Sequence, residues 1–517
     1  MDNNDAGRQP SRRQALVTAG LAAVAIPLFR QRHRPTPQPT PVGTPSPEPT
    51  PVPSGTDPAS PPPYITGLAG TPGAGYFTDQ NNNPRLWVAS ETWGLPVNAG
   101  QWTSPQGNWQ SDYDNFFSAR AAQGVTVTMT DPVWGDDGAS TGNTWDGVTP
   151  LAGGSTDPSS AALNSTFWTR IDYMFSSAQA NGITIGFDIA NIGDDVNSSV
   201  WFGYSWTTAQ WTSWATLIGT RYKNTPNLIW LVGNDMFSPY SDSILDAVQS
   251  GLSAAGDSHL IAAWYCAETT SRYDTSTNDP EDWGVSSSAF DFGYTYNAGY
   301  WVIEYAYGEV ANEGAASLLP VIWGDGYFYQ GGTSYSPTLD RAMRQETWWT
   351  LASGARGFLT EAENVYSWGS TSLAAVSSNW FFANNLGNIV TYFTSLPGWY
   401  QLLPDLSSSL VTGGRGTRVS GYASGGSGGQ YEPAFTNSWV AASITPSGSL
   451  AVLYLPNATT ITINQSLMQS GYTATWVDPV SGATSPATPG GTYNSTAQGT
   501  NSQGDPDWVL VLQTPPQ

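Results

Sequence analysis

Histidine and cysteine are almost absent from this sequence of 517 residues. The two histidines are His33 and His259, and Cys266 is the only cysteine. A zinc site needs three or four ligands that usually include Cys or His, and a Ser-His-Asp triad needs a histidine beside its nucleophile. One cysteine cannot form an intrachain disulfide, an iron–sulfur cluster or a CxxC redox pair. The chemistry must therefore rest on carboxylates, tyrosine, serine or backbone groups, and we expect neither a metal nor an organic cofactor.

Positive charge is also scarce. The chain has 17 basic and 40 acidic residues, and six of the arginines lie in the first 34 positions, against two acids there. Residues 35–517 therefore hold 11 basic and 38 acidic side chains, a net charge of -27. Because such a body repels phosphate backbones, we expect no nucleic-acid partner. The low charge density and the abundance of Ser, Thr, Gly, Asn and Trp favour an exported protein that acts on uncharged polymers.

Long apolar runs are missing except near the N-terminus. Residues 15–29 form one, but it is shorter than the ~20 residues that a membrane-spanning helix needs. It follows Ser11-Arg12-Arg13, an order similar to a twin-arginine export signal, with Ala23-Val24-Ala25 as a cleavage site. We therefore expect residues 1–34 to be an export signal or, as the alternative, an N-terminal anchor. Residues 35–63 read as a Pro/Thr-rich linker in extended polyproline II, which predicts a secreted or cell-surface protein with a tether.

Residues 64–398 show eight short apolar runs that alternate with amphipathic segments. The segment 165–180, for example, carries apolar side chains at three- and four-residue spacing, as a helix does. Eight strands alternating with helices over about 300 residues favour a (β/α)8 barrel. The alternative is a doubly wound sheet, but no GxGxxG motif follows the first run. The predicted strands are 86–90, 125–130, 183–189, 228–232, 260–264, 290–296, 318–323 and 357–360, with helices near 112–123, 165–180, 209–223, 241–255, 298–312 and 339–353.

Residues 399–517 have a different pattern. Alternating runs are separated by Gly, Pro, Asn and Ser turns with little helical periodicity, which predicts a smaller antiparallel β-sandwich. The expected strands are 411–419, 440–444, 450–455, 460–463, 472–477 and 508–512.

An acidic side chain or a tyrosine ends nearly every predicted barrel strand. Catalytic groups of such barrels lie at the C-terminal ends of the strands, and crowded carboxylates are costly unless they have a function. Tryptophans lie between them, and flat rings beside paired carboxylates are suited to binding and cleaving sugars. The candidate site residues are Glu91, Trp93, Asp131, Trp134, Asp188, Asn234, Asp235, Trp264, Tyr294, Tyr296, Trp323, Asp325, Glu361 and Trp368.

Some of these acids have a structural explanation: Asp131 and Asp188 could cap the helices that follow them. Two others are less easily explained in this way. Asp235 and Asp325 each follow an apolar strand and a glycine, on strands four and seven, from where they could flank one bond. We expect this pair to be catalytic.

Several motifs match one family. They are Glu91-Thr92-Trp93, the block RYxxxPNxIWxxGxD that runs from Arg221 to Asp235, the helix between Arg341 and Gly357, and Ala474 to Pro479. From about residue 74 to 512 the chain resembles the apiosidase-like hydrolases of glycoside hydrolase family 140, followed by a small β-domain often labelled collagen-binding.

The resemblance implies a retaining (β/α)8 hydrolase with Asp235 as general acid/base and Asp325 as nucleophile. Asp325 stands where the family usually has Glu, which shortens the side chain by one bond of about 1.5 Å. Glu91 stands where Asp is more usual, and Asn234 replaces a common Gly. Glu361 and Glu363, at the end of strand eight, are the alternative nucleophiles.

The sequence therefore predicts an exported glycoside hydrolase whose partner is a polysaccharide or oligosaccharide. A non-catalytic glycan-binding or cell-surface protein on a degenerate barrel is the alternative, which the altered motifs at Asp325 and Glu91 favour. A lyase with Tyr294 or Tyr296 as base is disfavoured, because it would need cations to neutralise an acidic sugar. The sugar, the linkage and the oligomeric state stay open at this stage.

Overall fold

The computed structural model describes most of the chain from residue 61 onward. The described ranges are 61–71, 73–134, 142–192, 205–236, 242–265, 269–270, 288–295, 298–312, 320–326, 332–334, 336–418 and 437–515. The expected export signal, nearly all of the linker, and Tyr296 lie outside these ranges.

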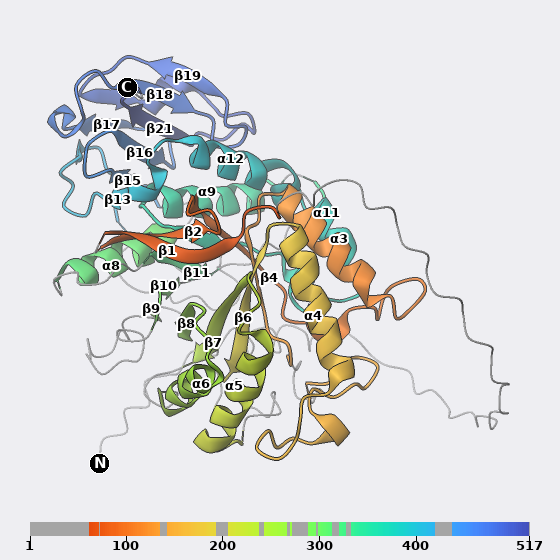
Figure 1. Cartoon of the computed structure of the whole chain (residues 1–517). Helices are drawn as coiled ribbons and strands as arrows, with labels where there is room; N and C mark the ends of the chain where they lie inside the picture. Colours follow the sequence, from red (N-terminus) through yellow and green to blue (C-terminus); the bar gives the residue numbers. More distant parts are fainter. Residues whose placement is uncertain are drawn as a thin grey trace, which may run out of the picture. The chain divides into compact units, whose positions relative to one another are not determined.

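Eight parallel strands form a nearly closed barrel (Figure 1). Their order around the barrel is β8-β7-β6-β5-β4-β12-β11-β10, and the short β9 (Thr269–Thr270) pairs antiparallel to β10. Between β8 and β10, the Ala289 N–H donates to the Ile261 carbonyl at 2.7 Å. Each of the eight predicted runs overlaps one strand, so the predicted fold class is confirmed. The strands are β4 (Trp87–Glu91), β5 (Val127–Thr130), β6 (Thr184–Asn191), β7 (Leu228–Met236), β8 (Ile261–Tyr265), β10 (Asp291–Tyr294), β11 (Val321–Asp325) and β12 (Gly357–Leu359).

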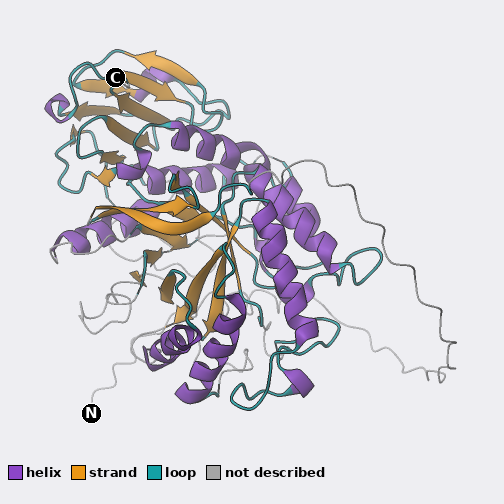
Figure 2. Cartoon of the chain, in the orientation of Figure 1, coloured by secondary structure: helices purple, strands orange, loops and turns teal. Residues whose placement is uncertain are grey.

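Helices surround the barrel strands (Figure 2). Two of them begin with the caps that their sequences suggest. The Asn164 side chain accepts the Thr166 N–H at the start of α4, and Thr207 forms a capping box with Gln210 at the start of α5. The helices are α2 (Leu95–Asn98), α3 (Trp109–Ala122), α4 (Ser165–Ala180), α5 (Thr208–Tyr222), α6 (Asp242–Ala255), α8 (Gly299–Asn312), α9 (Leu339–Ala352), α10 (Glu363–Tyr366), α11 (Ser372–Ser378) and α12 (Gly387–Ser395). None of the helices that the structure describes is long and apolar enough to cross a membrane.

Side chains on the barrel strands alternate between two apolar clusters. On β7, Ile229 and Leu231 belong to the cluster inside the barrel, while Trp230 and Val232 belong to the larger cluster between strands and helices. Residues paired in a parallel ladder share a face of the sheet. Cluster membership and register together therefore tell which residues near a strand end point into the barrel.

A small antiparallel sheet that the sequence did not predict packs at the amino-terminal ends of the barrel strands. It consists of β1 (Ile65–Thr71), β2 (Ala74–Asp79) and β3 (Pro84–Arg85). The Ile65 N–H donates to the Thr184 hydroxyl at 2.8 Å, and the Phe77 ring lies 5.2 Å from that of Trp87. The sheet covers the end of the barrel opposite the candidate site.

The C-terminal domain consists mainly of strands and loops (Figure 2). One sheet has the order β13-β15-β16-β21-β18-β19 and the other β14-β17-β20. All six predicted strands are present, although β14 ends at Gly413, earlier than expected; β13, β19 and β20 were not predicted. The strands are β13 (Leu403–Pro404), β14 (Val411–Gly413), β15 (Ala441–Ile444), β16 (Leu450–Leu455), β17 (Thr460–Ile463), β18 (Thr473–Val477), β19 (Thr484–Ala487), β20 (Thr492–Asn494) and β21 (Trp508–Gln513).

Candidate active site

A β-bulge turns Asp325 toward the barrel interior. Trp323 pairs with Gly293, but Asp325 pairs with the very next residue, Tyr294, so β11 has one residue more than β10 at this point. Trp323 belongs to the outer cluster, and strict alternation would place Asp325 on that outer face too. Its partner Tyr294 belongs instead to the interior cluster. The extra residue therefore re-aims the carboxylate, as bulges near active sites commonly do.

Glycine makes this bulge sterically feasible. A Cβ on Gly324 would lie 2.3 Å from the ring of Phe292, and one on Gly326 would lie 2.2 Å from the indole of Trp323. The Gly326 N–H donates to Asp325 Oδ1 at 2.6 Å, and the Asp325 side chain is almost completely buried. Glycines on both sides thus allow two aromatic rings to pack against the backbone that carries the carboxylate.

The end of β7 has a second interruption, directly before Asp235. Val232 pairs with Ala263 and Met236 with Tyr265, so β7 has two residues more than β8 over this stretch. Gly233 has a φ of 127° and Asn234 a φ of 57°. The left-handed region favours glycine and, among other residues, asparagine, which explains how Asn234 can stand where the family commonly has glycine. Strained backbone of this kind concentrates at functional sites; the side chain of Asp235 itself lies outside the described atoms.

A third bulge lies on β6, the strand between β5 and β7 in the barrel. Asp188 pairs with the interior residue Leu231, and Ala190 pairs with Val232, which leaves Ile189 as the extra residue. The buried Asp188 accepts the Ala190 N–H at 3.0 Å. This contact is an Asx turn within the strand end and not a helix cap, so it leaves Asp188 at an inward-facing position.

Asp131 is joined to this group through an amide. Its Oδ2 accepts from Asn191 Nδ2 at 3.1 Å, and its Oδ1 accepts the Val133 N–H at 2.8 Å. Glu91 pairs with Met129, a residue of the interior cluster, so it too faces inward. The inward-facing polar group at the carboxyl ends of the strands therefore includes Glu91, Asp131, Asp188, Asn191, Tyr294 and Asp325.

Two tryptophans meet across the barrel. Trp93 follows β4 and Trp264 lies on β8, and these two strands are on opposite sides of the eight-stranded order. Their ring centroids are 5.1 Å apart, and Phe292 contacts the other side of Trp264 at 4.7 Å. The two rings therefore fill part of the barrel interior near the carboxyl ends of the strands. Because aromatic rings flank Trp264, the flat face that a sugar would stack on is taken, and its Nε1–H has no hydrogen-bond acceptor in the described part of the chain.

Glu361 has a structural environment. Its Oε1 accepts from Arg120 Nη2 at 2.6 Å and from the Ala362 N–H, and its Oε2 accepts from the Ser90 hydroxyl. Burial raises the pKa of Glu361 above its ordinary value, and the charge of Arg120 offsets part of that rise. Arg120 comes from α3, outside the barrel, so this carboxylate bonds toward the helix layer. The geometry disfavours Glu361 as a nucleophile, and the side chain of Glu363 lies outside the described atoms.

Two other predicted tryptophans also lie away from the interior. Trp323 belongs to the outer cluster. Trp368 packs edge-on against Phe116 at 5.7 Å, and its indole N–H donates to Asp112 Oδ2 at 3.3 Å. Trp134, by contrast, belongs to the interior cluster and contacts Tyr366 at 6.0 Å. Of the five predicted tryptophans, three are placed inside the barrel.

The described residues contain no group of three or more His, Cys, Asp and Glu side chains that could hold a metal ion. The histidine among them, His259, lies just before β8 at the opposite end of the barrel, where its ring contacts Asp257 at 3.0 Å and the Thr225 carbonyl at 2.8 Å. Among the described residues, the chemistry available at the strand ends is that of carboxylates, an amide and aromatic rings.

A family model for the apiosidase-like catalytic domain matches residues 72–397, which is more than half of the chain. The chain belongs to the apiosidase-like family. A second model, described as "Putative collagen-binding domain of a collagenase", matches residues 437–513. Both matches confirm the resemblance that the motifs predicted. No curated protein sequence matches the chain.

Solved structures with the same fold are glycoside hydrolases. One, named only as a glycoside hydrolase, is 16% identical with a TM-score of 0.66, over 86% of this chain and 96% of the other. A family 5 glycoside hydrolase from Bacteroides vulgatus is 16% identical with a TM-score of 0.63, over 87% of this chain and 95% of the other. At this identity the likeness establishes the fold alone. With the family match, it makes the apiosidase-like chain a glycoside hydrolase on a (β/α)8 barrel.

Sequence reasoning missed two residues of this site and one ion pair beside it. Asn191 is absent from the predicted site residues, although an amide beside two acids could have indicated it. Phe292 could have been found from the alternation of Phe290, Phe292 and Tyr294, which places all three on one face. The ion pair of Arg120 with Glu361 was also missed, because no local signal links two residues 241 positions apart in the sequence.

Proposed function

We propose that this apiosidase-like hydrolase cleaves a glycosidic bond of a neutral polysaccharide or oligosaccharide with retention of configuration. Asp235 is the general acid/base and Asp325 the nucleophile. The observation that carries the assignment is the bulge at Gly324, which gives Asp325 an inward-facing position, together with the interruption of β7 directly before Asp235.

The proposed reaction has two steps. Asp325 attacks the anomeric carbon while Asp235 protonates the leaving glycosidic oxygen, which gives a covalent glycosyl–enzyme intermediate. Asp235 then removes a proton from water as the water attacks that carbon and releases Asp325. Retention is proposed from the family resemblance. Carboxyl groups of a retaining pair should lie ~5 to 5.5 Å apart.

The charge at the strand ends supports an uncharged substrate. Glu91, Asp131 and Asp188 accompany Asp325 there, and residues 35–517 hold only 11 basic side chains against 38 acidic ones. A uronic acid would be repelled by this group. The family description makes glycans with terminal apiose the first substrates to try. The twin-arginine-like segment and the Pro/Thr linker support an exported enzyme at, or released from, the cell surface.

The test is a screen of neutral glycans and aryl glycosides, followed by kinetics of two variants. Asp325→Ala should lose activity by several orders of magnitude and regain part of it with azide, because an external anion can replace a missing nucleophile. Asp235→Asn should lose more activity on sugars with poor leaving groups than on dinitrophenyl glycosides, which need no protonation.

Glu361→Gln is the matched control, because Glu361 is also a carboxylate after a barrel strand. We expect no azide rescue from it, and circular dichroism will report whether its loss of the Arg120 ion pair affects the fold. Rescue of a Glu361 variant but not of Asp325→Ala would reassign the nucleophile. Unchanged turnover in both Asp235→Asn and Asp325→Ala would refute the mechanism.

A further inference from the structure

The larger sheet of the C-terminal domain is apolar on both faces. Along β16, Ala451, Leu453 and Leu455 belong to the core of the domain itself. The alternate residues Val452 and Tyr454 belong to the apolar cluster that surrounds the barrel. Antiparallel sheets commonly leave one face to water. Here the second face is instead buried against the catalytic domain.

The barrel helix α9 is the main element on that second face. From Ala342 to Ala352 every residue of α9 is buried. The indole N–H of Trp348 donates to the Pro479 carbonyl at 2.8 Å, and that of Trp349 donates to the Trp439 carbonyl at 2.9 Å. The same helix links β11, which ends in Asp325, to β12. A helix that would normally expose one side to solvent is therefore enclosed between the barrel and the sheet.

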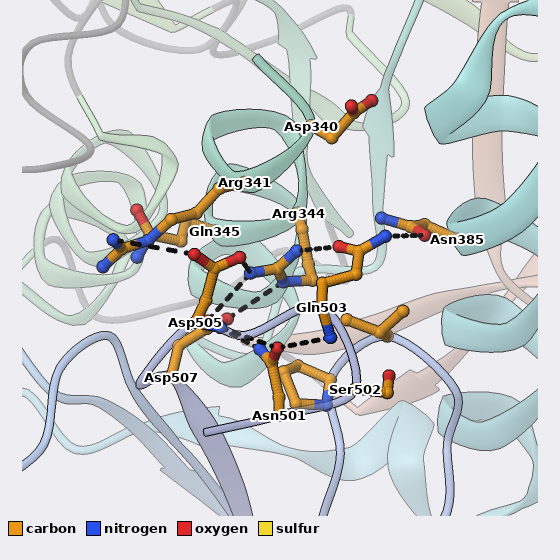
Figure 3. Close-up of polar contacts among 12 residues, drawn as sticks. Asp340, Arg341, Arg344, Gln345, Asn385, Asn501, Ser502, Gln503, Asp505 and Asp507 are labelled. Carbon is orange, nitrogen blue, oxygen red and sulfur yellow. Dashed lines mark hydrogen bonds and ion pairs between the residues drawn. The ribbon is translucent and has the colours of Figure 1, made fainter. Parts of the chain in front are cut away.

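A buried ion cluster fixes the register of this contact (Figure 3). Arg344, on α9, is fully buried. Its Nε and Nη2 donate to the two oxygens of Asp507 at 3.0 and 2.8 Å, and Nη2 also donates to Asp505 at 2.7 Å. The Tyr454 hydroxyl donates to Asp507 at 3.0 Å. Burial alone would lower the pKa of Arg344. The charge and hydrogen bonds of Asp507 outweigh this effect and raise the pKa above its ordinary value, so the guanidinium stays charged.

The loop that supplies these acids is shaped around the arginine. Asn501 Oδ1 accepts the backbone N–H groups of Gln503 and Asp505, and Asn501 Nδ2 donates to Asp507 at 2.9 Å. Gln503 also reaches the barrel domain, where its amide donates to Asn385 at 3.2 Å (Figure 3). A side chain of the catalytic domain thus provides the cation that this acidic loop surrounds.

We infer that the C-terminal domain is a permanent internal partner of the catalytic barrel, and that the face of its larger sheet is a closed interface with α9. The face is therefore not a binding surface for collagen or a glycan, and an external ligand of this domain must use the smaller sheet, β14-β17-β20, or its loops. Residues 62–517 form one compact unit, which agrees with this inference.

Calorimetry of the full chain and of Arg344→Met tests the inference. We expect the wild type to unfold in one cooperative transition. Arg344→Met should lower the Tm several-fold more than Arg221→Met, because removing one partner of a buried pair costs far more than breaking an exposed one. Arg221 is the matched control, since its ion pair with Asp172 is partly exposed on the barrel helices. Two separate transitions in the wild type, or equal Tm losses in both variants, would overturn the inference.

Hydrogen exchange keeps the inference testable if Arg344→Met does not fold. In the wild type, amides of α9 and of β16 should be exposed in the same unfolding event, with matching dependence on denaturant. Earlier opening of β16 than of α9 would contradict a permanent interface. Added type I collagen should leave the exchange of β16 unchanged, because that face is already covered, and protection of β16 by collagen would also refute the inference. Neither measurement depends on glycosidase activity.

Discussion

A buried glutamate between two barrel helices should make the protein more stable in acid. Glu346, on α9, is buried, and its Oε2 accepts the N–H of Gly299 at the start of α8 at 2.6 Å. Its other oxygen has no donor within the described residues. Burial raises the pKa of Glu346 to about 8, and the hydrogen bond from Gly299 lowers it only in part. The folded protein therefore holds this proton at pH values where the unfolded chain releases it.

The direction of the effect follows from proton linkage. Below pH 4.5 both states are protonated, and the neutral side chain carries no penalty. As the pH rises from 4.5 toward 8, the unfolded chain gains stability by ionising and the folded state does not. At 1.36 kcal/mol per pH unit, the free energy of unfolding falls by about 3 kcal/mol between pH 4.5 and 7. With roughly 2.1 cal/mol/K per residue, this equals about 3 °C in Tm for the folded unit.

Glu346→Gln should remove this pH dependence. The amide keeps an acceptor for Gly299, and its NH2 group can reach toward the buried Thr350 hydroxyl, which lies beside Gly299 and has no partner of its own among the described residues. We expect the variant to match the wild type at pH 4.5 and to exceed its unfolding free energy by about 3 kcal/mol at pH 7. Urea unfolding followed by tryptophan fluorescence at pH 4.5, 6, 7 and 8 measures the free energy of unfolding of the wild type and of the variant.

A second buried glutamate serves as the control for this experiment. Glu304, on α8, accepts from Arg418 at 2.9 Å and from the Trp439 indole at 3.1 Å. Glu304→Gln removes a charge that faces arginines, so it should be destabilising at pH 7 and 8, the opposite sign to Glu346→Gln. Because burial raises the pKa of Glu304 and the arginines offset only part of that rise, the loss should be smaller at pH 4.5. The reasoning about Glu346 fails if the wild type shows no loss of stability between pH 4.5 and 8, or if Glu346→Gln retains the same slope.

Three further predictions concern the active site. Trp264→Phe replaces the fused indole with one ring and leaves a gap between Trp93 and Phe292, so it should cost about 1 to 3 kcal/mol in unfolding free energy and lower kcat/KM, while Trp87→Phe, at the other end of the barrel, should leave kinetics unchanged. Gly324→Ala puts a Cβ 2.3 Å from a facing aromatic ring and should cost about 1 to 3 kcal/mol in chemical unfolding, whereas Gly332→Ala, with nothing near its Cβ, should be neutral. Asn234→Gly should retain activity, and Asn234→Val should lose it in steady-state assays, because a β-branched residue disfavours a φ of 57°.

Elements with strong periodicity could be predicted from the sequence, and short or long-range features could not. The helix 165–180 was predicted with the observed bounds, because its apolar spacing and the capping residue Asn164 agree. The two-residue strand β3 and the unit β1-β2 were missed, since Gly-rich runs such as 65–71 carry little alternation. Their stability comes from contacts with Trp87 and Thr184, which local sequence does not reveal.

The predicted site residues differ in whether their side chains face the barrel interior, and irregularities at the strand ends cause this difference. Placing a group after a strand says that it lies at the right end of the barrel, but not on which face. Trp323 precedes its bulge and points outward, whereas Asp325 follows the bulge and pairs with an inward residue. Glu361 lies two residues beyond the last paired residue of β12, where alternation no longer applies, and an arginine from α3 captures it.

The bulges therefore decide which residues face the lumen, and the alternation of apolar and polar residues in the sequence does not reveal them. A regular strand would present every second residue to the lumen, and β11 would then offer Gly324 and not Asp325. The sequence departs from regular strand chemistry with Gly324 on β11 and with Gly233 and Asn234 on β7. Local departures of this kind cost stability and persist in natural proteins mainly where function requires them. We therefore regard a glycine one or two residues before an acid at a barrel strand end, as at Asp325 and Asp235, as more specific support for the proposed catalytic carboxylates than the acid alone.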